Sequence, residues 1–368
     1  MTDKLIYQIG LTMINGVGDI LARHLLQTLG DAEAVFAEKQ QLLGRIPGIG
    51  SHLAAEIKRP EILQRAEKEL AFIEKNNISC YYLIDADYPA RLRECPDAPI
   101  LFYFKGNTNL DASRIISVVG TRNATEYGRG LTESLIKDLA EAIPNLLVVS
   151  GLAYGIDICA HRSALHNQLP TVAVLAHGLD RIYPSSHRNT AVEMLESGGL
   201  LTDFPSGTEP DRPNFLRRNR IVAGMSDCTI VVESAEKGGS LVTADIAFSY
   251  GRDVYSFPGR VGDSHSKGCN NLIRQNKAGL ITSADDLLSA LCWDIQATAT
   301  PAQTELLFRR YGCFRPGTKS GFSHHANAER NSYQRACLSI GDAGASTFYA
   351  IVRTGNKREN KSVTGEYL

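Results

Sequence analysis

Ile115-Ile116-Ser117-Val118-Val119, followed at once by Gly120-Thr121-Arg122, is the stretch that decides the predicted fold. Four β-branched residues and a serine, without a charge, form the pattern of a parallel strand that is buried on both faces. Thr121 and Arg122 follow a glycine turn at the carboxyl end of this strand, where α/β sheets bind their ligands. A hydroxyl and a forked guanidinium suit a phosphate group, although a glycine turn with a surface arginine is an alternative interpretation.

Similar short apolar runs alternate with helical patterns further along the chain. The runs occupy residues 115–119, 146–149, 171–175, 200–203, 229–232 and 254–257. Between them, apolar residues at helical spacing predict helices at 128–142, 158–166, 185–196 and 241–250. Alternating strands and helices of this kind predict an α/β fold, a doubly wound and mostly parallel sheet with helices on both faces.

The regions on either side of the predicted sheet differ from it in pattern. Residues 1–75 indicate a small all-α domain, residues 76–110 a connector with a short strand, and residues 111–295 the sheet domain. In the first region, Gly16-Val17-Gly18 and Gly48-Ile49-Gly50 each precede a helix and resemble tandem helix-hairpin-helix motifs. Amides exposed at such turns can hold a phosphate, but an equally supported interpretation is that the glycines only allow tight turns.

The last segment of the chain, residues 296–368, is predicted to be a linker and a basic tail. Residues 309–368 contain ten Lys and Arg against four Asp and Glu, although the whole chain has a net charge of -1. They show neither helical nor alternating periodicity, so we expect disorder and no winged helix. The composition resembles the translation of a shifted reading frame beginning near residue 308.

The bulk composition is that of an ordinary globular protein, with 43% hydrophobic and 21% charged residues in a chain of 368. The first residues do not have the pattern of a signal peptide, and no apolar run approaches the roughly 20 residues of a membrane span. The eight cysteines include no C-x-x-C pair, which argues against a zinc site. We therefore expect a cytoplasmic protein with reduced thiols, without a metal and without a membrane partner.

The common signatures of enzymes are missing from the sequence. It has no G-x-G-x-x-G, no G-x-x-x-x-G-K-[ST], no H-E-x-x-H and no G-x-S-x-G. The histidines are scattered, so they predict packing or hydrogen bonding rather than a catalytic set. We expect no catalytic residues and no cofactor, and we do not expect an enzyme.

Three further stretches have residues suited to a polyanion. Ser150-Gly151 begins a glycine-containing turn before the helix of His161, in which Asp157 is either a helix cap or a ligand contact. The stretch from Arg212 to Arg220 contains four arginines and Phe215, just before a predicted helix at 221–225. Cations that follow phosphates and rings that stack on bases are typical of single-strand grooves, although charge runs are usually solvated surfaces. Gly239-Ser240 at a helix start is typical of a phosphate nest.

These stretches, taken in order, resemble the DprA/Smf family over roughly residues 85–290. The residues that carry the resemblance include Gly120-Thr121-Arg122, Ser150-Gly151, His177-Gly178-Leu179-Asp180 with Tyr183-Pro184, residues 217–224, Gly239-Ser240 and Gly268-Cys269-Asn270. The resemblance implies an extended Rossmann-like fold that binds and protects single-stranded DNA without a nucleotide cofactor. It also implies loading of the RecA recombinase onto that DNA, a role in natural transformation and recombination, and a homodimer.

The resemblance also assigns the DNA site. It implies a phosphate contact at Arg212, a stacking ring at Phe215, a groove lined by Arg217, Arg218 and Arg220, and close approach of the DNA backbone at Gly120 and Ser150-Gly151. The predicted set is Gly120, Thr121, Arg122, Ser150, Gly151, Arg212, Phe215, Arg217, Arg218, Asn219, Arg220, Gly239 and Ser240.

Two other functions remain as alternatives. A nucleotide-processing hydrolase of the lysine-decarboxylase-like group would share the sheet, with Asp245 as the nearest acid to the glycine turn. The Pro and Thr that such enzymes have in this turn are missing here, which weighs against hydrolysis. The other alternative is a protein adaptor built on the helical domain.

Overall fold

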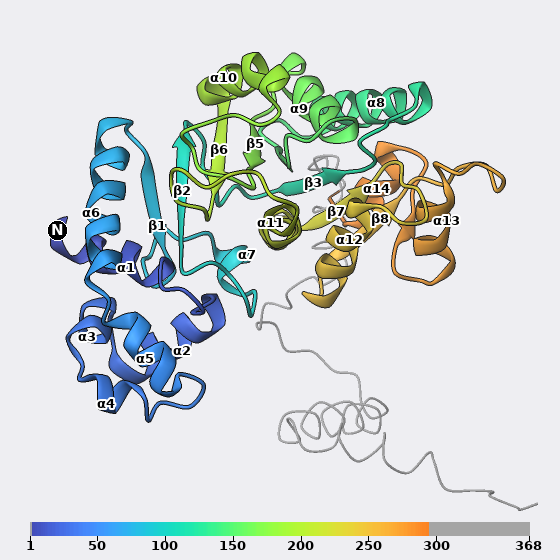
Figure 1. Cartoon of the computed structure of the whole chain (residues 1–368). Coiled ribbons are helices and arrows are strands. Elements are labelled where there is room, and N and C mark those ends of the chain that lie inside the picture. The colour runs from blue at the N-terminus through green and yellow to red at the C-terminus, as the bar shows by residue number, and fades with distance from the viewer. Residues whose placement is uncertain (1, 294–368) are drawn as a thin grey trace, which may run out of the picture. The chain divides into compact units, whose positions relative to one another are not determined.

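The computed structural model describes residues 2–293 (Figure 1). The predicted linker and basic tail, including the question of a winged helix, therefore lie outside the described residues. None of the helices in the described part is long and apolar enough to cross a membrane.

A nine-stranded sheet forms the centre of this part of the chain, in the order β1-β2-β6-β5-β4-β3-β7-β8-β9. The strands from β6 to β9 in this order pair in parallel, whereas β2 pairs antiparallel with β1 and β6. Their bounds are β1 Ser79–Tyr82, β2 Leu101–Gly106, β3 Ile115–Val119, β4 Leu147–Ser150, β5 Thr171–Val174, β6 Gly198–Thr202, β7 Cys228–Val231, β8 Asp253–Ser256 and β9 Gly279–Leu280. The predicted α/β, Rossmann-like, mostly parallel sheet is confirmed.

Both faces of the sheet are buried because each strand presents apolar side chains alternately to two layers of helices. In β3, Ile115 and Val119 belong to one core, and Ile116 and Val118 to the other. One layer consists of α8 Glu126–Ala142, α9 Ile156–His166, α10 Arg188–Ser197 and α14 Ala284–Ala290 (Figure 1). The opposite layer consists of α11 Arg212–Gly224, α12 Gly239–Ser249 and α13 Lys267–Arg274.

Helix α11 begins nine residues earlier than the sequence predicts, so the arginine stretch is helical rather than a loop before a helix at 221–225. Asp211 has an extended backbone at the N-cap position, and Pro213 lies in the first turn. Proline is tolerated there because the backbone amides of the first turn have no partner within the helix. The sequence did not predict this part of the helix because its many charged residues leave little apolar periodicity.

Short helices precede the sheet: α1 Thr2–Thr12, α2 Asp19–Leu29, α3 Ala32–Ala37, α4 Gln40–Leu43, α5 Gly50–Ile57 and α6 Pro60–Lys75, with α7 Ala90–Arg93 between β1 and β2. Gly16 and Gly48 have positive φ angles of 82° and 86° in the two turns before α2 and α5. A Cβ atom on Gly16 would lie 2.8 Å from Leu53, and one on Gly48 would lie 3.1 Å from Leu21. Each turn thus packs against the helix that follows the other turn. This close packing explains why glycine occupies both positions. The division into domains at residues 75, 110 and 295 stays a prediction.

His161 joins α9 to the sheet inside the core. Its Nδ1 lies 2.7 Å from the Thr171 hydroxyl, which itself donates to the Val148 carbonyl at 2.9 Å. The hydroxyl must therefore accept from Nδ1–H, and the buried Nε2 has no partner among the described residues. Burial, with smaller contributions from Arg218 and His187, lowers the pKa of His161 to about 3.

We expect His161 to make stability depend on pH. The unfolded histidine binds a proton near pH 6.5 and the folded one only near pH 3, so its contribution to stability is complete above pH 6.5 and is lost as the pH falls toward 3. In urea unfolding, His161→Gln should reduce the slope of the unfolding free energy against pH by about 1.4 kcal/mol per unit between about pH 6 and about pH 4. Parallel curves for the two proteins would show that this histidine is not buried in its neutral form.

Candidate nucleic-acid interface

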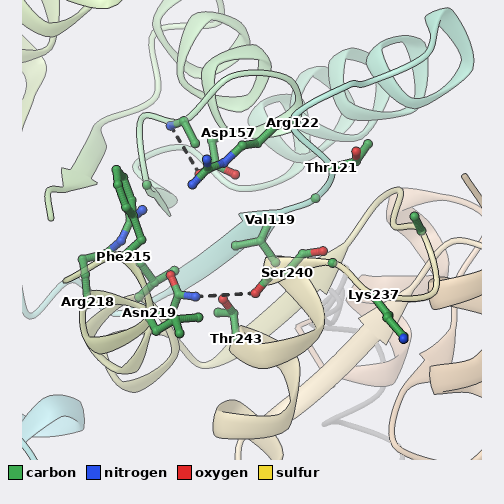
Figure 2. Close-up of a pocket in the computed structure, with 18 of the residues that line it drawn as sticks. Val119, Thr121, Arg122, Asp157, Phe215, Arg218, Asn219, Lys237, Ser240 and Thr243 are labelled. Atoms are coloured by element: carbon green, nitrogen blue, oxygen red, sulfur yellow. Dashed lines mark hydrogen bonds between the residues drawn. The ribbon is translucent and has the colours of Figure 1, made fainter. Parts of the chain in front are cut away.

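A cavity of about 630 Å³ lies beyond the carboxyl ends of β3, β4 and β7, with α11 along one side. The chain runs outward from β3 through β4, β5 and β6 and then returns to place β7 on the other side of β3, so β3 marks the switch point of the sheet. Doubly wound sheets bind ligands at this point because the loops on either side diverge there. The lining residues include Val119, Gly120, Thr121, Arg122, Gly151, Asp157, Arg212, Phe215, Leu216, Arg218, Asn219, Lys237, Gly239 and Ser240 (Figure 2).

The loop after β3 places a cation over an aromatic ring. The guanidinium carbon of Arg122 lies 5.0 Å from the centre of the Phe215 ring on α11. This distance is within the range of a cation–π interaction. The ion pairs of the described residues include neither Arg122 nor Arg212, both of which are exposed, so their charges are available to an anion.

Arg218 is a buried cation in the wall of the cavity. Its Nη1 donates to the Val174 carbonyl, its Nε has no partner among the described residues, and its guanidinium carbon lies 6.0 Å from the centre of the Phe215 ring. Burial lowers the pKa of Arg218 to about 10, against the opposing attraction of Asp157. The side chain therefore stays charged near neutral pH, and its positive potential is fixed in place before any ligand arrives.

Asp157 is the acidic residue in this lining. Gly155 is the N-cap of α9, so Asp157 is not the cap but lies in the first turn, where its Oδ2 accepts from the Ala153 amide at 3.4 Å. Burial raises the pKa of its carboxyl group, and the nearby Arg218 opposes this shift. The sequence left its role open between helix cap and ligand contact, and the structure excludes the cap and places Asp157 in the lining.

The start of α12 presents backbone groups to the cavity. Gly239 is the first residue of the helix, and a Cβ atom built on it meets nothing within 4 Å. The Asn219 side-chain amide donates to the Gly239 carbonyl at 3.5 Å, and the Ser240 hydroxyl donates to that of Ser234 at 3.0 Å. An open glycine at a helix N-terminus leaves amides accessible to an anion. Figure 2 shows Asn219 of α11 and Ser240 of α12 on neighbouring helices.

The charges of the lining favour an anionic ligand. The lining contains four cations, Arg122, Arg212, Arg218 and Lys237, and one carboxylate, that of Asp157. The Phe215 ring lies beside two of these cations, Arg122 and Arg218. The cavity therefore offers cations for phosphates and an aromatic surface for rings at short range.

Two arginines of the predicted groove lie elsewhere. Arg220 pairs with Asp203 at 2.6 Å and with Asp19 at 2.9 Å, and Arg217 lies 3.3 Å from both carboxylates. The helical repeat turns positions 212, 215 and 219 toward the cavity and positions 217 and 220 away from it. Arg217 and Arg220, which the sequence predicts to line the groove, are therefore not part of this lining and instead bind α11 to the start of α2.

The small residues after β3 and β4 have packing roles that the sequence did not reveal. The buried Ser150 hydroxyl donates to the Val118 carbonyl at 2.6 Å. A Cβ atom on Gly120 would lie 2.4 Å from Ile156, and one on Gly151 would lie 1.9 Å from the Arg218 Nη1. Side chains of the protein therefore fill the space beside these glycines. The sequence instead predicts that the DNA backbone approaches there.

Lys237 is a lining residue that the predicted set omitted. Its position directly before Gly238-Gly239 was the available signal, because a cation beside a glycine nest suits a phosphate. Asp245, the acid of the hydrolase alternative, forms an ion pair with Lys277 at 2.6 Å and is not part of the lining.

Comparisons with known proteins agree with the resemblance seen in the sequence. The family model of DNA recombination-mediator protein A matches residues 79–292. Protein Smf of Synechocystis is 34% identical over 77% of this chain and 72% of its own length. The X-ray structure of DNA processing protein A from Streptococcus pneumoniae superposes with a TM-score of 0.63 at 32% identity, over 77% of this chain and 97% of that one. DNA processing protein A from Helicobacter pylori, described for its single-stranded DNA binding mode, has a TM-score of 0.53 at 29% identity, over 58% and 95% of the two chains.

Two glycine variants separate packing from an open surface. Gly151→Ala places a methyl group against the buried Arg218 and should lower the unfolding free energy by about 1–3 kcal/mol. Gly239→Ala meets no atom within 4 Å and should change it by less than about 0.5 kcal/mol. Urea denaturation of both variants measures the difference. Equal stabilities would mean that Arg218 is not held where the structure places it.

Proposed function

The chain belongs to the family of DNA recombination-mediator protein A, and we propose that its cavity binds single-stranded DNA and protects it during recombination. The observation that carries this proposal is the excess of cations around an aromatic ring at the switch point of the sheet. We propose a binding protein rather than an enzyme, because the cations, the Phe215 ring and the open start of α12 suit an anion with planar groups.

In the proposed complex, phosphates lie against Arg122, Arg212 and Lys237 and against the open start of α12 at Gly239. These cations are exposed and can follow a flexible backbone. Arg218 attracts the phosphates through its charge from the wall of the cavity, since its burial prevents it from reaching far into the cavity. Thr121 and Asn219 supply neutral hydrogen-bonding groups beside the phosphates.

Bases are proposed to lie on the Phe215 side of the cavity. The Arg122 guanidinium over the Phe215 ring forms one planar surface, and bases stack on guanidinium planes as well as on rings. An unpaired strand can turn its bases into such a cavity, whereas a duplex keeps them stacked inside. The proposed preference for single strands follows from this difference.

The finer parts of the function rest on family membership. We propose that the protein loads RecA onto the bound strand, in natural transformation and recombination, and that it acts in the cytoplasm. A homodimer is also proposed, supported by the edge strand β9, which within residues 2–293 pairs with β8 alone and exposes 53% of Leu280. An unpaired edge with an exposed apolar side chain suits a second copy of the chain.

A salt series tests the proposed site. Arg122→Ala should weaken binding of a fluorescein-labelled oligothymidylate by about fivefold or more in fluorescence anisotropy. It should also make the slope of log affinity against log salt shallower by about 0.7, since one phosphate contact of a single strand is lost. The matched control is Lys137→Ala, which removes a cation from an exposed position on α8 outside the cavity.

The control should leave both the affinity and the slope close to those of the unaltered protein. If Arg122→Ala and Lys137→Ala change binding to the same small degree, the cavity is not the DNA site. The hairpin turns of the first 75 residues would then be the next candidates.

A further inference from the structure

We propose that Tyr154 and Tyr183 form a second base-stacking subsite at the edge of the cavity, here called the tyrosine rim. This inference rests on the proposed function and extends it, because it states where the strand runs after it leaves Phe215. The class of ligand is an unpaired nucleobase of the same DNA strand.

Both rings of the tyrosine rim are exposed beside the cavity. Tyr183 is 46% exposed, and its ring centre lies 6.0 Å from that of Phe215, which lines the cavity. Tyr154 is 49% exposed and follows Ala153, another lining residue. Large aromatic side chains lose favourable apolar burial when they stay in water, so two of them at one cavity edge suggest a ligand surface.

Phe215 is the centre of a cluster of planar groups. The guanidinium carbons of Arg122 and Arg218 lie 5.0 and 6.0 Å from its ring centre, and the ring centre of Tyr183 lies 6.0 Å from it. A base that extends the stack beyond this group therefore meets Tyr183 next.

The loop that carries Tyr183 is held rigidly by a buried histidine. The His177 Nε2 accepts from the Tyr183 amide at 3.2 Å, and its Nδ1–H donates to the Gly178 carbonyl at 2.9 Å. This arrangement requires the neutral imidazole. Burial lowers the pKa of His177, which also favours the neutral form.

A second buried histidine holds Tyr154. The His187 Nδ1–H donates to the Leu152 carbonyl at 2.9 Å, and its ring meets that of Tyr154 edge-on, with centres 4.9 Å apart at 71°. The Ser186 hydroxyl lies 3.5 Å from that of Tyr154, so both rings flank the same loop. Rings placed in advance bind a ligand at a smaller entropic cost.

The contact at the rim is expected to be stacking rather than ionic. Arg181, the cation two residues before Tyr183, already pairs with Asp180 and Glu209, each at 3.1 Å. A stacking contact releases no counterion when DNA binds, so the loss of a ring lowers affinity without changing the salt slope. The salt dependence therefore distinguishes the tyrosine rim from the phosphate contacts of the cavity.

The test compares Tyr183→Leu, which removes the ring, with Tyr183→Phe, which keeps it, and uses Arg122→Ala as the reference for the cavity. Anisotropy is measured with oligothymidylates of increasing length across a salt series. With long oligonucleotides, Tyr183→Leu should weaken binding about fivefold or more with an unchanged salt slope, and Tyr183→Phe should bind like the unaltered protein. With oligonucleotides too short to leave the cavity, the loss should disappear. Tyr154→Leu, at a separate exposed position, should show the same pattern.

Each contrary result has a distinct meaning. If both leucine variants bind like the unaltered protein while Arg122→Ala weakens binding, the tyrosine rim is wrong and the proposed function stands. If Tyr183→Phe loses as much affinity as Tyr183→Leu, the hydroxyl group and not stacking is responsible, which also overturns the inference. If Arg122→Ala has no effect either, the cavity itself is not the DNA site.

Discussion

The buried ion pair between Arg220 and Asp203, 2.6 Å apart, determines which way α11 faces. Asp203 follows β6, so the pair ties the helix to the sheet, and Asp19 extends the same cluster to the first residue of α2. Removing one partner of such a pair leaves a buried charge and costs about 3–5 kcal/mol. With this face fixed, the helical repeat leaves Arg212, Phe215 and Asn219 on the cavity side. The N-terminal helices therefore contribute to the site by positioning α11, whether or not they touch a ligand.

Charge inside the cavity is arranged before a ligand is bound. The buried Arg218 keeps its charge although burial lowers its pKa, and the glycine at position 151 makes room for its guanidinium. Buried imidazoles, at His161, His177 and His187, brace the strands and loops around it. Rigid supports of this kind suit a flexible polyanion, because the protein then has little ordering left to do when it binds.

The sheet and part of the site could be predicted from local sequence. The apolar run at 115–119 matches β3. A strand that is buried on both faces is apolar along its whole length, so it can be recognised without knowing which strands lie next to it. The course of α11 could not be predicted, since arginines mask its period. The positions of Arg217 and Arg220 depend on Asp19 and Asp203, and the need for Gly151 depends on Arg218, all of them distant in sequence. Local sequence patterns do not reveal which distant residues a side chain contacts.

The most direct test of the central claim is cross-linking of an oligonucleotide that contains 4-thiothymidine, followed by mass spectrometry of the attached peptides. The account predicts cross-links in residues 119–123, 212–219 and 237–240, which lie together only in the folded cavity. Cross-links confined to the hairpin turns at residues 15–18 and 47–50, or to the basic residues after 309, would contradict it.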